Sequence, residues 1–232
     1  MNIPDGMLLV DKPKFVSSFK VCSIIKSTLK AKKTGHCGTL DPLATGLLLI
    51  LINGATKLQD KFMKCDKEYL TSFKLGIKTD SGDMDGKIIE TKDFSFVDKN
   101  SLTKALNNFV GEIEQIPPMF SALKVDGQKL YNLARKGITI QRSPRKVNVQ
   151  KIDFLYFADG VLNLLIKCSS GTYIRSIADD LGNSLGCGAV VTFLRRESIG
   201  SFNVSEAVDE KSFSNPEFLI SKIIPQETLN EK

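Results

Sequence analysis

The sequence predicts an α+β protein with a mixed, largely antiparallel sheet flanked by helices. Strand-like and helix-like segments follow one another without the strict strand–helix–strand alternation of parallel α/β folds. Residues 147–157 and 161–169 are expected as two strands joined by the tight turn Ala158-Asp159-Gly160, which indicates an antiparallel hairpin. The chain has 232 residues, of which 42% are hydrophobic and 25% charged, a composition typical of globular proteins. A chain of this length buries roughly 70% of its unfolded surface, which suffices for a core without disulfides.

Two apolar runs in the first part of the chain predict buried strands, at residues 6–10 and 47–52. Between them, Ser17 or Ser18 can cap a helix, because apolar residues then recur at helical spacing. Those apolar positions are Val21, Ile24, Ile25 and Leu29. A short helix near residues 56–63 is expected after the second strand.

The later part of the chain also mixes strands and helices. Residues 69–75 alternate in part between apolar and polar side chains, which predicts a half-buried strand. Residues 101–109 predict a helix with Ser101 as its cap. Thr172 is expected to cap a further helix, and the β-branched run 189–194 predicts a strand. The apolar face of that last helix consists of Ile174, Ile177, Ala178 and Leu181.

Composition excludes several protein classes. The longest apolar run, residues 47–52, is far shorter than the roughly 18 residues needed to span a membrane. The N-terminus lacks the basic and apolar regions of a signal peptide. The five cysteines form no C-x-x-C pair and predict neither a disulfide framework nor a zinc site. Because the sequence also lacks a signal peptide, we expect the protein in the reducing cytoplasm. The single histidine, His36, leaves no second imidazole for a metal site.

Charge and motifs narrow the function further. The net charge is +6, from 32 Lys and Arg against 26 Asp and Glu, and it modestly favours a polyanionic partner such as nucleic acid. The sequence contains no phosphate loop of the form G-x-x-x-x-G-K-[ST] and no G-x-G-x-x-G between a strand and a helix. It also lacks the G-x-S-x-G elbow of serine hydrolases.

The segment from Gly35 to Gly46 is the part of the sequence most suggestive of chemistry. Its glycines and Pro42 predict a shaped loop rather than a regular element. Asp41 precedes Pro42 and is therefore held extended, which fixes the direction of its side chain. A carboxylate presented in this way can act as a nucleophile or as an electrostatic stabiliser, and equally as a turn aspartate that bonds its own backbone. By the same reasoning, the sequence leaves three roles open for His36: a general base, a metal ligand or a residue that only packs.

This loop, GHCGTLDPLATG, resembles the signature of the TruB family of tRNA pseudouridine-55 synthases. Further segments resemble the other motifs of the family in the same order, so that the resemblance covers roughly residues 6 to 200. These segments are Leu8–Pro13, Lys67–Tyr69 with Leu75–Gly86, Gln115–Lys124, Gly171–Ser176 and Leu185–Arg196.

The resemblance implies an isomerase that breaks the N-glycosidic bond of a uridine, turns the base and rejoins it through C5. No cofactor and no metal is expected for this redox-neutral reaction. By match to the family motifs, Asp41 is the catalytic carboxylate and Arg175 is the arginine that pairs with it. An anion at the sugar face suits the positive charge that develops during glycosidic cleavage. Tyr69 matches the tyrosine that stacks on the target base.

The same match assigns substrate-binding residues. Tyr173 and Leu194 correspond to positions that line the uracil pocket, and His36 corresponds to a histidine that helps to hold the flipped RNA. A base inside a folded RNA must leave its stack before chemistry can occur. The implied substrate is the T-loop of tRNA, with the target uridine at position 55.

The resemblance also implies a domain organisation. Residues 1–200 form the pseudouridine synthase catalytic domain, with an RNA-clamping insertion at about 117–146 that contains a helical piece near 129–136. Residues 201–232 form a short C-terminal tail, too short for the full RNA-binding PUA domain that many members carry.

Basic side chains around the substrate are expected to contact RNA phosphates. The candidates are Lys32, Lys33, Lys124, Lys129, Arg142 and Arg145. Arg195 and Arg196 are expected nearer to the sheet edge. We expect a monomer that requires neither a membrane nor a protein partner. Two alternatives remain open: a tRNA-folding chaperone that binds without turnover, and a guide-RNA-dependent synthase of the same superfamily.

Overall fold

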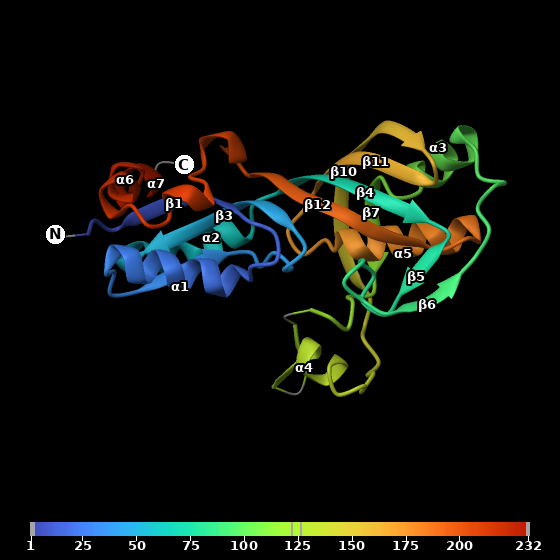
Figure 1. Ribbon diagram of the computed structural model, residues 1–232, viewed down its shortest axis with the longest axis horizontal. Coiled ribbons are helices and arrows are strands. Elements are labelled where there is room, and N and C mark those ends of the chain that lie inside the picture. The colour runs from blue at the N-terminus through green and yellow to red at the C-terminus, as the bar shows by residue number, and fades with distance from the viewer. Residues whose placement is uncertain (1–2, 122, 126, 231–232) are drawn as a thin grey trace. The chain divides into compact units, whose positions relative to one another are not determined.

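A computed structural model of the chain describes residues 3–121, 123–125 and 127–230. The chain divides into two compact units (Figure 1). The first unit contains the residues up to Tyr69 together with those from Leu194 onward, and the second contains Leu70–Phe193. Each unit is described by itself below.

The first unit is built around two central strands that are buried on both faces, β1 (Gly6–Lys12) and β3 (Thr45–Ile52). Its other strands are β2 (Thr34–Cys37), β13 (Phe202–Asn203) and β14 (Ile224–Pro225), with the second half of β12 (Ala189–Ile199). β1 pairs antiparallel with β3 and β14, and β2 pairs antiparallel with β3. β12 pairs parallel with β3 where Arg195 lies opposite Thr45. The sheet of this unit is therefore mixed.

Alternate residues of β1 and β3 contribute to two separate apolar clusters. Leu8 and Ile50 pack with the buried face of α1 (Ser18–Leu29), which lies along these strands in Figure 1. Met7 and Leu49 face the other way and pack with Phe62. Because both faces are covered, the strands are continuous apolar runs rather than alternating ones. The predicted strands and the cap of α1 are confirmed, since the Ser17 side chain accepts a hydrogen bond from the Lys20 N–H at 3.1 Å.

The C-terminal residues complete the core of the first unit. They form η2 (Val204–Glu206), η3 (Glu210–Ser212), α6 (Pro216–Ser221) and α7 (Gln226–Asn230). Val208 exchanges backbone hydrogen bonds of 2.9 Å with β1, and Phe213 and Leu219 are buried in the α1 cluster. The segment therefore packs as part of this unit.

The second unit combines a sheet with helices α3 (Lys99–Asn107) and α5 (Ile174–Leu185). Its strands are the greater part of β4 (Lys67–Leu75), β5 (Ile77–Thr79), β6 (Ile88–Thr91), β7 (Gly111–Gln115), β8 (Lys124–Val125), β9 (Gln128–Lys129), β10 (Arg145–Ala158), β11 (Val161–Cys168) and the first half of β12. β10 pairs antiparallel with both β7 and β11. In Figure 1, α5 lies against these strands, and its predicted apolar face is buried.

The predicted hairpin is confirmed as β10–β11. Asp159 and Gly160 at its turn have φ angles of 51° and 71°. Two consecutive positive φ values match the right-handed twist of the strands on either side, and Asp-Gly is a preferred pair for such a turn. The short helix α4 (Leu130–Ala134) confirms the helical piece expected near residues 129–136.

Two predicted helix caps are wrong. The N-cap of α3 is Asp98, whose side chain accepts the Ser101 N–H at 2.8 Å, and Ser101 is the third helical residue of this capping box. Because the Asp98 side chain accepts this N–H, the aspartate is the N-cap and the helix begins before the serine. The N-cap of α5 is Tyr173, with no side-chain cap, because the Thr172 hydroxyl donates to the Ser169 carbonyl at 3.0 Å instead.

Two other boundaries also differ from the sequence prediction. The segment expected as a helix near residues 56–63 divides into η1 (Asn53–Leu58) and α2 (Gln59–Met63). The glycine-rich segment 35–46 is not irregular throughout, because β2 ends within it and β3 begins within it. The α+β class with a mixed, largely antiparallel sheet is confirmed.

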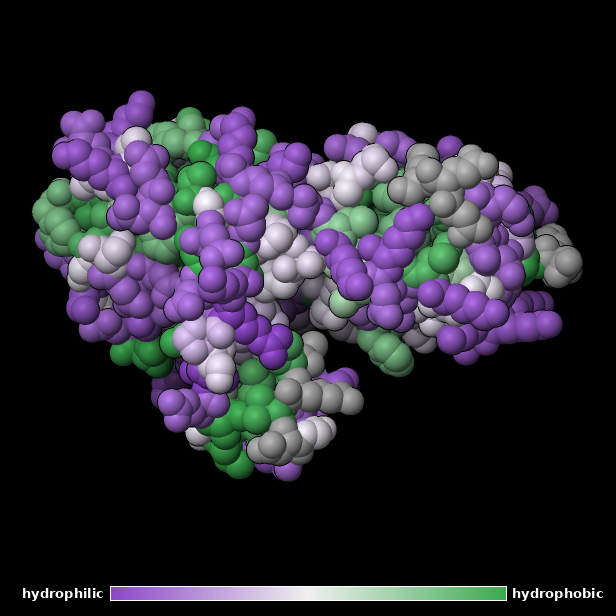
Figure 2. Space-filling model, turned by 180° about the vertical axis from the view of Figure 1, so that it is seen from behind, coloured by the Kyte–Doolittle hydropathy of each residue, from purple (hydrophilic) through white to green (hydrophobic). Residues whose placement is uncertain are grey.

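The surface agrees with the charged composition. On the face shown in Figure 2, hydrophilic side chains cover most of both units, interrupted by small apolar areas. Among the described residues, no helix combines the length and the apolar character needed to cross a bilayer.

Candidate active site

The loop that carries Asp41 joins β2 to β3 and is held by the segment between β1 and α1. The Phe15 N–H donates to the Pro42 carbonyl at 2.7 Å. The Ser18 hydroxyl donates to the Leu40 carbonyl at 3.0 Å and accepts the Leu40 N–H at 2.9 Å. These bonds fix the backbone on both sides of Asp41, as the sequence predicts for a stiff loop.

Two buried cations, Lys12 and Arg196, hold the same loop, and Lys12 does so from the end of β1. The Lys12 side chain is fully buried, and its ammonium group donates to the carbonyls of Pro13, Val16 and Pro42 at 2.8, 2.7 and 3.3 Å. A buried charge is tolerated where its hydrogen bonds are satisfied. Arrangements of this kind fix a backbone path because several carbonyls converge on one donor.

Arg196 of β12 holds the start of the loop and the strand that follows it. Its side chain is 1% exposed, and it donates to the Leu47 carbonyl at 2.8 Å and to the Gly38 carbonyl at 3.0 Å. The glycines in the loop permit this approach. A Cβ at Gly46, where φ is 98°, would lie 2.3 Å from the Arg196 carbonyl oxygen. Only glycine fits that position.

The electrostatics of this part of the site follow from burial and from these charges. The pKa of Lys12 is lowered to about 8. Burial is the largest cause, the Asp41 carboxylate opposes it, and the Arg196 guanidinium adds to the lowering. Burial and Arg196 also lower the pKa of His36. His36 is therefore a neutral imidazole at pH 7, and its buried Nδ1 has no hydrogen-bond partner within the described part of the chain.

Tyr69 and Leu194 lie in the strands where the chain passes from one unit to the other. Tyr69 of β4 is 9% exposed and Leu194 of β12 is 8% exposed. Burial of alternate residues along β4 explains the position of the tyrosine.

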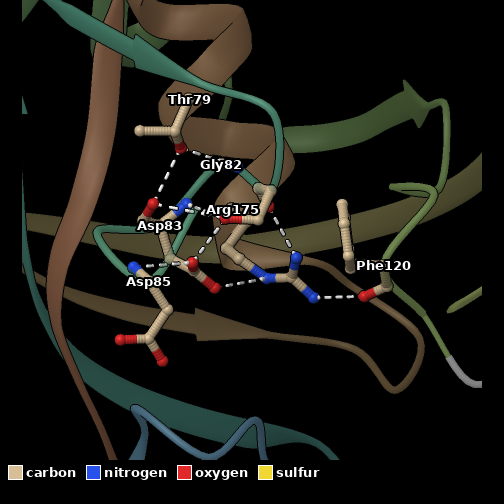
Figure 3. A network of polar contacts seen from close by, with 7 residues as sticks. Thr79, Gly82, Asp83, Asp85, Phe120 and Arg175 are labelled. Atoms are coloured by element: carbon tan, nitrogen blue, oxygen red, sulfur yellow. Dashed lines mark hydrogen bonds and ion pairs between the residues drawn. The ribbon is translucent and has the colours of Figure 1, made fainter. Parts of the chain in front are cut away.

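Arg175 is the centre of a polar network in the second unit (Figure 3). It is the second residue of α5 and is only 5% exposed. Its guanidinium donates to the Ser81 and Phe120 carbonyls, each at 2.7 Å, and its Nε lies 3.7 Å from Oδ2 of Asp83. Arg175 is therefore not an exposed cation on the helix surface. A cation in the first turn of a helix needs such partners because the helix dipole disfavours it.

Asp83 is itself held firmly. Its Oδ1 accepts the Ser81 hydroxyl at 2.6 Å and the Asp85 N–H at 3.2 Å. Its neighbours Gly82 and Met84 exchange backbone hydrogen bonds of 3.1 Å with Val191 of β12. The carboxylate is thus fixed beside Arg175 by a loop that is paired to a strand.

Residues at the start of α5 also anchor the beginning of the predicted insertion. The Gln115 side chain accepts the Tyr173 N–H at 3.0 Å and donates to the Tyr173 carbonyl at 3.2 Å. The Ser176 hydroxyl donates to the Ile116 carbonyl at 3.2 Å. Together with the bond from Arg175 to Phe120, these contacts tie residues 115–120 to one helix end.

The predicted site residues therefore fall into two groups. His36, Asp41, Tyr69 and Leu194 belong to the first unit, and Tyr173 and Arg175 belong to the second. Within the described residues, no cluster of His, Cys, Asp or Glu side chains could hold a metal ion.

Sequence reasoning missed three residues of these groups. Lys12 and Asp83 lie inside the motifs that resemble those of the family, but the sequence predicts no role for either. Arg196 is predicted near the sheet edge, whereas it is buried. Its neighbour Arg195 is half-buried and forms a bidentate ion pair with Asp11 at 3.0 and 2.7 Å. Alternation along β12 is the signal that separates the two arginines, because neighbours on a strand face opposite sides.

The predicted phosphate contacts are of three kinds. Lys32, Lys33, Lys129 and Arg145 are exposed. Arg142 is half-buried and donates to the Pro117 carbonyl at 3.1 Å, a structural contact that links the two ends of the predicted insertion. The Lys124 side chain lies outside what the structure describes.

Comparison with known proteins identifies the family. Residues 26–174 match the N-terminal domain of the TruB family of pseudouridylate synthases, and residues 175–228 match the C-terminal domain of tRNA pseudouridylate synthase B. A tRNA pseudouridine synthase B of Endomicrobium trichonymphae is 52% identical over 97% of both chains. The enzyme of the same name from Clostridium tetani is 43% identical over 96% of this chain and 77% of that one.

A solved structure shares the fold. A chain in the crystal structure of a Cbf5-Nop10-Gar1 complex superposes with a TM-score of 0.74 at 26% identity, over 97% of this chain. This chain spans only 61% of the length of that one. The match of both TruB domains, with relatives above 40% identity, shows that the chain belongs to the TruB family of pseudouridylate synthases.

Proposed function

We propose that the chain isomerises uridine to pseudouridine at position 55 in the T-loop of tRNA. The observation that carries the proposal is the Asp41 loop, held by buried Lys12 and Arg196, in a chain 52% identical to a tRNA pseudouridine synthase B. A carboxylate on a backbone that is hydrogen-bonded on both sides is suited to meet one atom of a substrate.

Asp41 supplies the catalytic carboxylate. The N-glycosidic bond of the uridine breaks, the base turns, its C5 bonds to the sugar, and the proton on C5 leaves. Positive charge develops on the sugar during the first step, and an anion beside it stabilises that charge or bonds to it. The Asp41 carboxylate and the buried ammonium of Lys12 attract each other, since the carboxylate raises the pKa of Lys12.

The remaining site residues bind and position the base. Tyr69 stacks on the extruded uracil, and Tyr173 and Leu194 contribute to the pocket that receives it. Arg175 completes the catalytic set as a fixed cation, a role supported by its burial and by its ordered partners. Neutral His36 contacts the flipped RNA; an uncharged imidazole can enter a base stack without the cost of burying a charge.

The rest of the chain grips the RNA. We assign residues 1–200 to catalysis, residues 117–146 to an RNA-clamping insertion and residues 201–232 to a supporting tail. Exposed lysines and arginines contact phosphates on either side of the target. The enzyme acts as a monomer in the cytoplasm, without a protein partner.

The guide-RNA-dependent alternative is less favoured. The chain is 52% identical to a tRNA pseudouridine synthase B over nearly its whole length and only 26% identical to the chain in the Cbf5-Nop10-Gar1 complex. The chaperone alternative has no specific observation in its favour.

Release of tritium tests the proposal. The purified chain is incubated with unmodified tRNA that carries tritium at uridine C5, because isomerisation must expel that hydrogen whereas binding cannot. We expect release by the wild type and none by Asp41→Asn, with RNA binding retained. Asp60→Asn, an exposed acid in α2, is the matched control and should release tritium normally. Release by Asp41→Asn at the wild-type rate would remove Asp41 from the mechanism.

A further inference from the structure

We infer that Phe15 and Phe19, named here the aromatic edge, form a stacking surface for unpaired nucleobases of the RNA substrate beside the Asp41 loop. This inference rests on the proposed function and deepens it, because it adds a second RNA-binding element to the same site. The aromatic edge is exposed, strained at its backbone, flanked by basic residues and attached to the Asp41 loop, and all of these features lie within the first unit.

The two rings contribute little to the core. Phe15 is 69% exposed and Phe19 is 77% exposed, the largest exposed fractions among the large hydrophobic side chains of the described residues. Elsewhere the apolar side of α1 faces inward, with Val21, Ile25 and Leu29 buried. The first turn of the helix and the residues before it thus present aromatic rings to solvent, although burial of an aromatic ring is strongly favourable.

The backbone at Phe15 is strained. Its φ angle is 64°, a left-handed conformation that glycine adopts freely and a bulky residue rarely does. The hydrogen bond from its N–H to the Pro42 carbonyl holds this conformation and ties it to the residue after Asp41. A phenylalanine that is strained and also exposed is explained by contact with a ligand, since strained residues cluster at binding sites.

Charge indicates which ligand. The Lys14 ammonium lies 4.8 Å from the centre of the Phe15 ring, and Lys20 follows Phe19. No acidic residue occurs between Asp11 and Asp41, whereas this stretch contains seven lysines, of which only Lys12 is buried. Rings beside ammonium groups suit single-stranded nucleic acid, because bases stack on the rings and phosphates pair with the cations.

A lipid surface would also attract aromatic and basic side chains. The aromatic edge is confined to one end of α1, however, and is bonded to the Asp41 loop, where an RNA substrate must come. We therefore commit to unpaired nucleobases and treat vesicle binding as an outcome that counts against the proposal.

Affinity for tRNA tests the aromatic edge. Binding of labelled, unmodified tRNA is measured by fluorescence anisotropy in an Asp41→Asn background, which keeps the RNA unmodified. Phe15→Gly and Phe19→Ala should each weaken binding about fivefold or more, because a stacked base contributes about 1–3 kcal/mol. Phe96→Ala, which removes another exposed ring, should leave affinity unchanged. Wild-type affinity in the Phe15→Gly/Phe19→Ala double variant would overturn the proposal.

Two further measurements define the contact. Phe19→Leu keeps an apolar side chain and loses the ring; it should bind as weakly as Phe19→Ala, and full affinity would show that no base stacks there.

The slope of log K against log[salt] should be unchanged in the phenylalanine variants, because stacking neutralises no phosphate. In the Lys14→Ala/Lys20→Ala variant the slope should become shallower by roughly 0.7 for each lysine.

Two controls separate failure of the aromatic edge from misfolding and from failure of the proposed function. Phe15→Gly should not lower the unfolding midpoint, because glycine relieves the strained backbone. Absence of tritium release by the wild type would reject the proposed function, whereas the aromatic edge is judged by affinity alone. Loss of binding to anionic phosphatidylglycerol vesicles in the double variant, with tRNA affinity retained, would overturn the aromatic edge and leave the enzyme proposal intact.

Discussion

The buried ammonium group of Lys12 donates a hydrogen bond to the carbonyl of Pro42, the residue that follows Asp41. The same group also bonds the carbonyls of Pro13 and Val16, so one side chain organises the end of β1 and the loop. These contacts make the backbone path next to Asp41 a property of the core rather than of a surface turn.

Lys12→Met should therefore destabilise the fold. The substitution keeps the volume but removes one donor from each of three carbonyls, of which Pro42 keeps the Phe15 N–H, and we expect a loss of about 3 kcal/mol in the free energy of unfolding. Urea denaturation measures this loss, and Lys20→Met, which removes an exposed lysine, serves as the control. Equal midpoints for the two variants would contradict the structural role of Lys12.

The pKa of Lys12 predicts a pH dependence. Its folded-state pKa is lowered to about 8, below the ordinary value near 10.4, so between these values the unfolded chain binds more protons than the folded chain. Stability must then rise with pH across this window, by up to about 1.4 kcal/mol per pH unit. The difference in unfolding free energy between wild type and Lys12→Met should increase from pH 8 to pH 10. A difference that shrinks over this range would show that the ammonium pKa is not lowered.

Arg175→Lys should lower both stability and turnover. A lysine cannot reach the Ser81 and Phe120 carbonyls and Asp83 together, whereas the guanidinium contacts all three. We expect a loss of about 2 kcal/mol in stability and a fall in kcat of tenfold or more. Thermal unfolding and single-turnover kinetics at saturating tRNA measure the two effects. Arg145→Lys, on the exposed side of β10, should unfold like the wild type.

Tyr69→Leu should produce a folded protein with severely reduced turnover. Leucine fills much of the buried volume but offers no ring on which a base can stack. Circular dichroism checks folding and tritium release measures turnover, with Tyr156→Leu as a control because that ring is 59% exposed. Normal turnover in Tyr69→Leu would contradict the stacking role.

Binding to tRNA should depend strongly on salt. If about five phosphates are neutralised, log K against log[salt] should have a slope near −3.5. Titrations at several KCl concentrations give the slope. A flat response would remove the electrostatic part of the account.

Much of the fold could be predicted from the sequence because its determinants are local. The apolar runs of β1 and β3, the spacing on α1 with Ser17 at its cap, and Asp159-Gly160 at the hairpin each depend on a few neighbouring residues. The wrong prediction for the cap of α3 also arises from neighbouring residues. Asp98 and Ser101 can both cap a helix, and only the structure shows which residue accepts the hydrogen bond.

For the candidate site, the sequence predicts which residues take part but not the contacts that hold them. Asp41 in a rigid loop follows from Pro42, but its restraint by Arg196 joins positions more than 150 residues apart. Arg175 and Asp83 are likewise separated by a long stretch of sequence. Lysine and arginine are rarely buried, so residue type alone would place Lys12 and Arg196 at the surface.

The base found at position 55 of tRNA after incubation shows whether Asp41 is needed for isomerisation at that position. Unmodified tRNA is incubated with wild-type or Asp41→Asn protein, labelled with a carbodiimide that marks pseudouridine, and read by reverse transcription. We expect a stop immediately 3′ of position 55 with the wild type and none with Asp41→Asn. A stop of equal strength with both proteins, or a stop only at other positions, would contradict it.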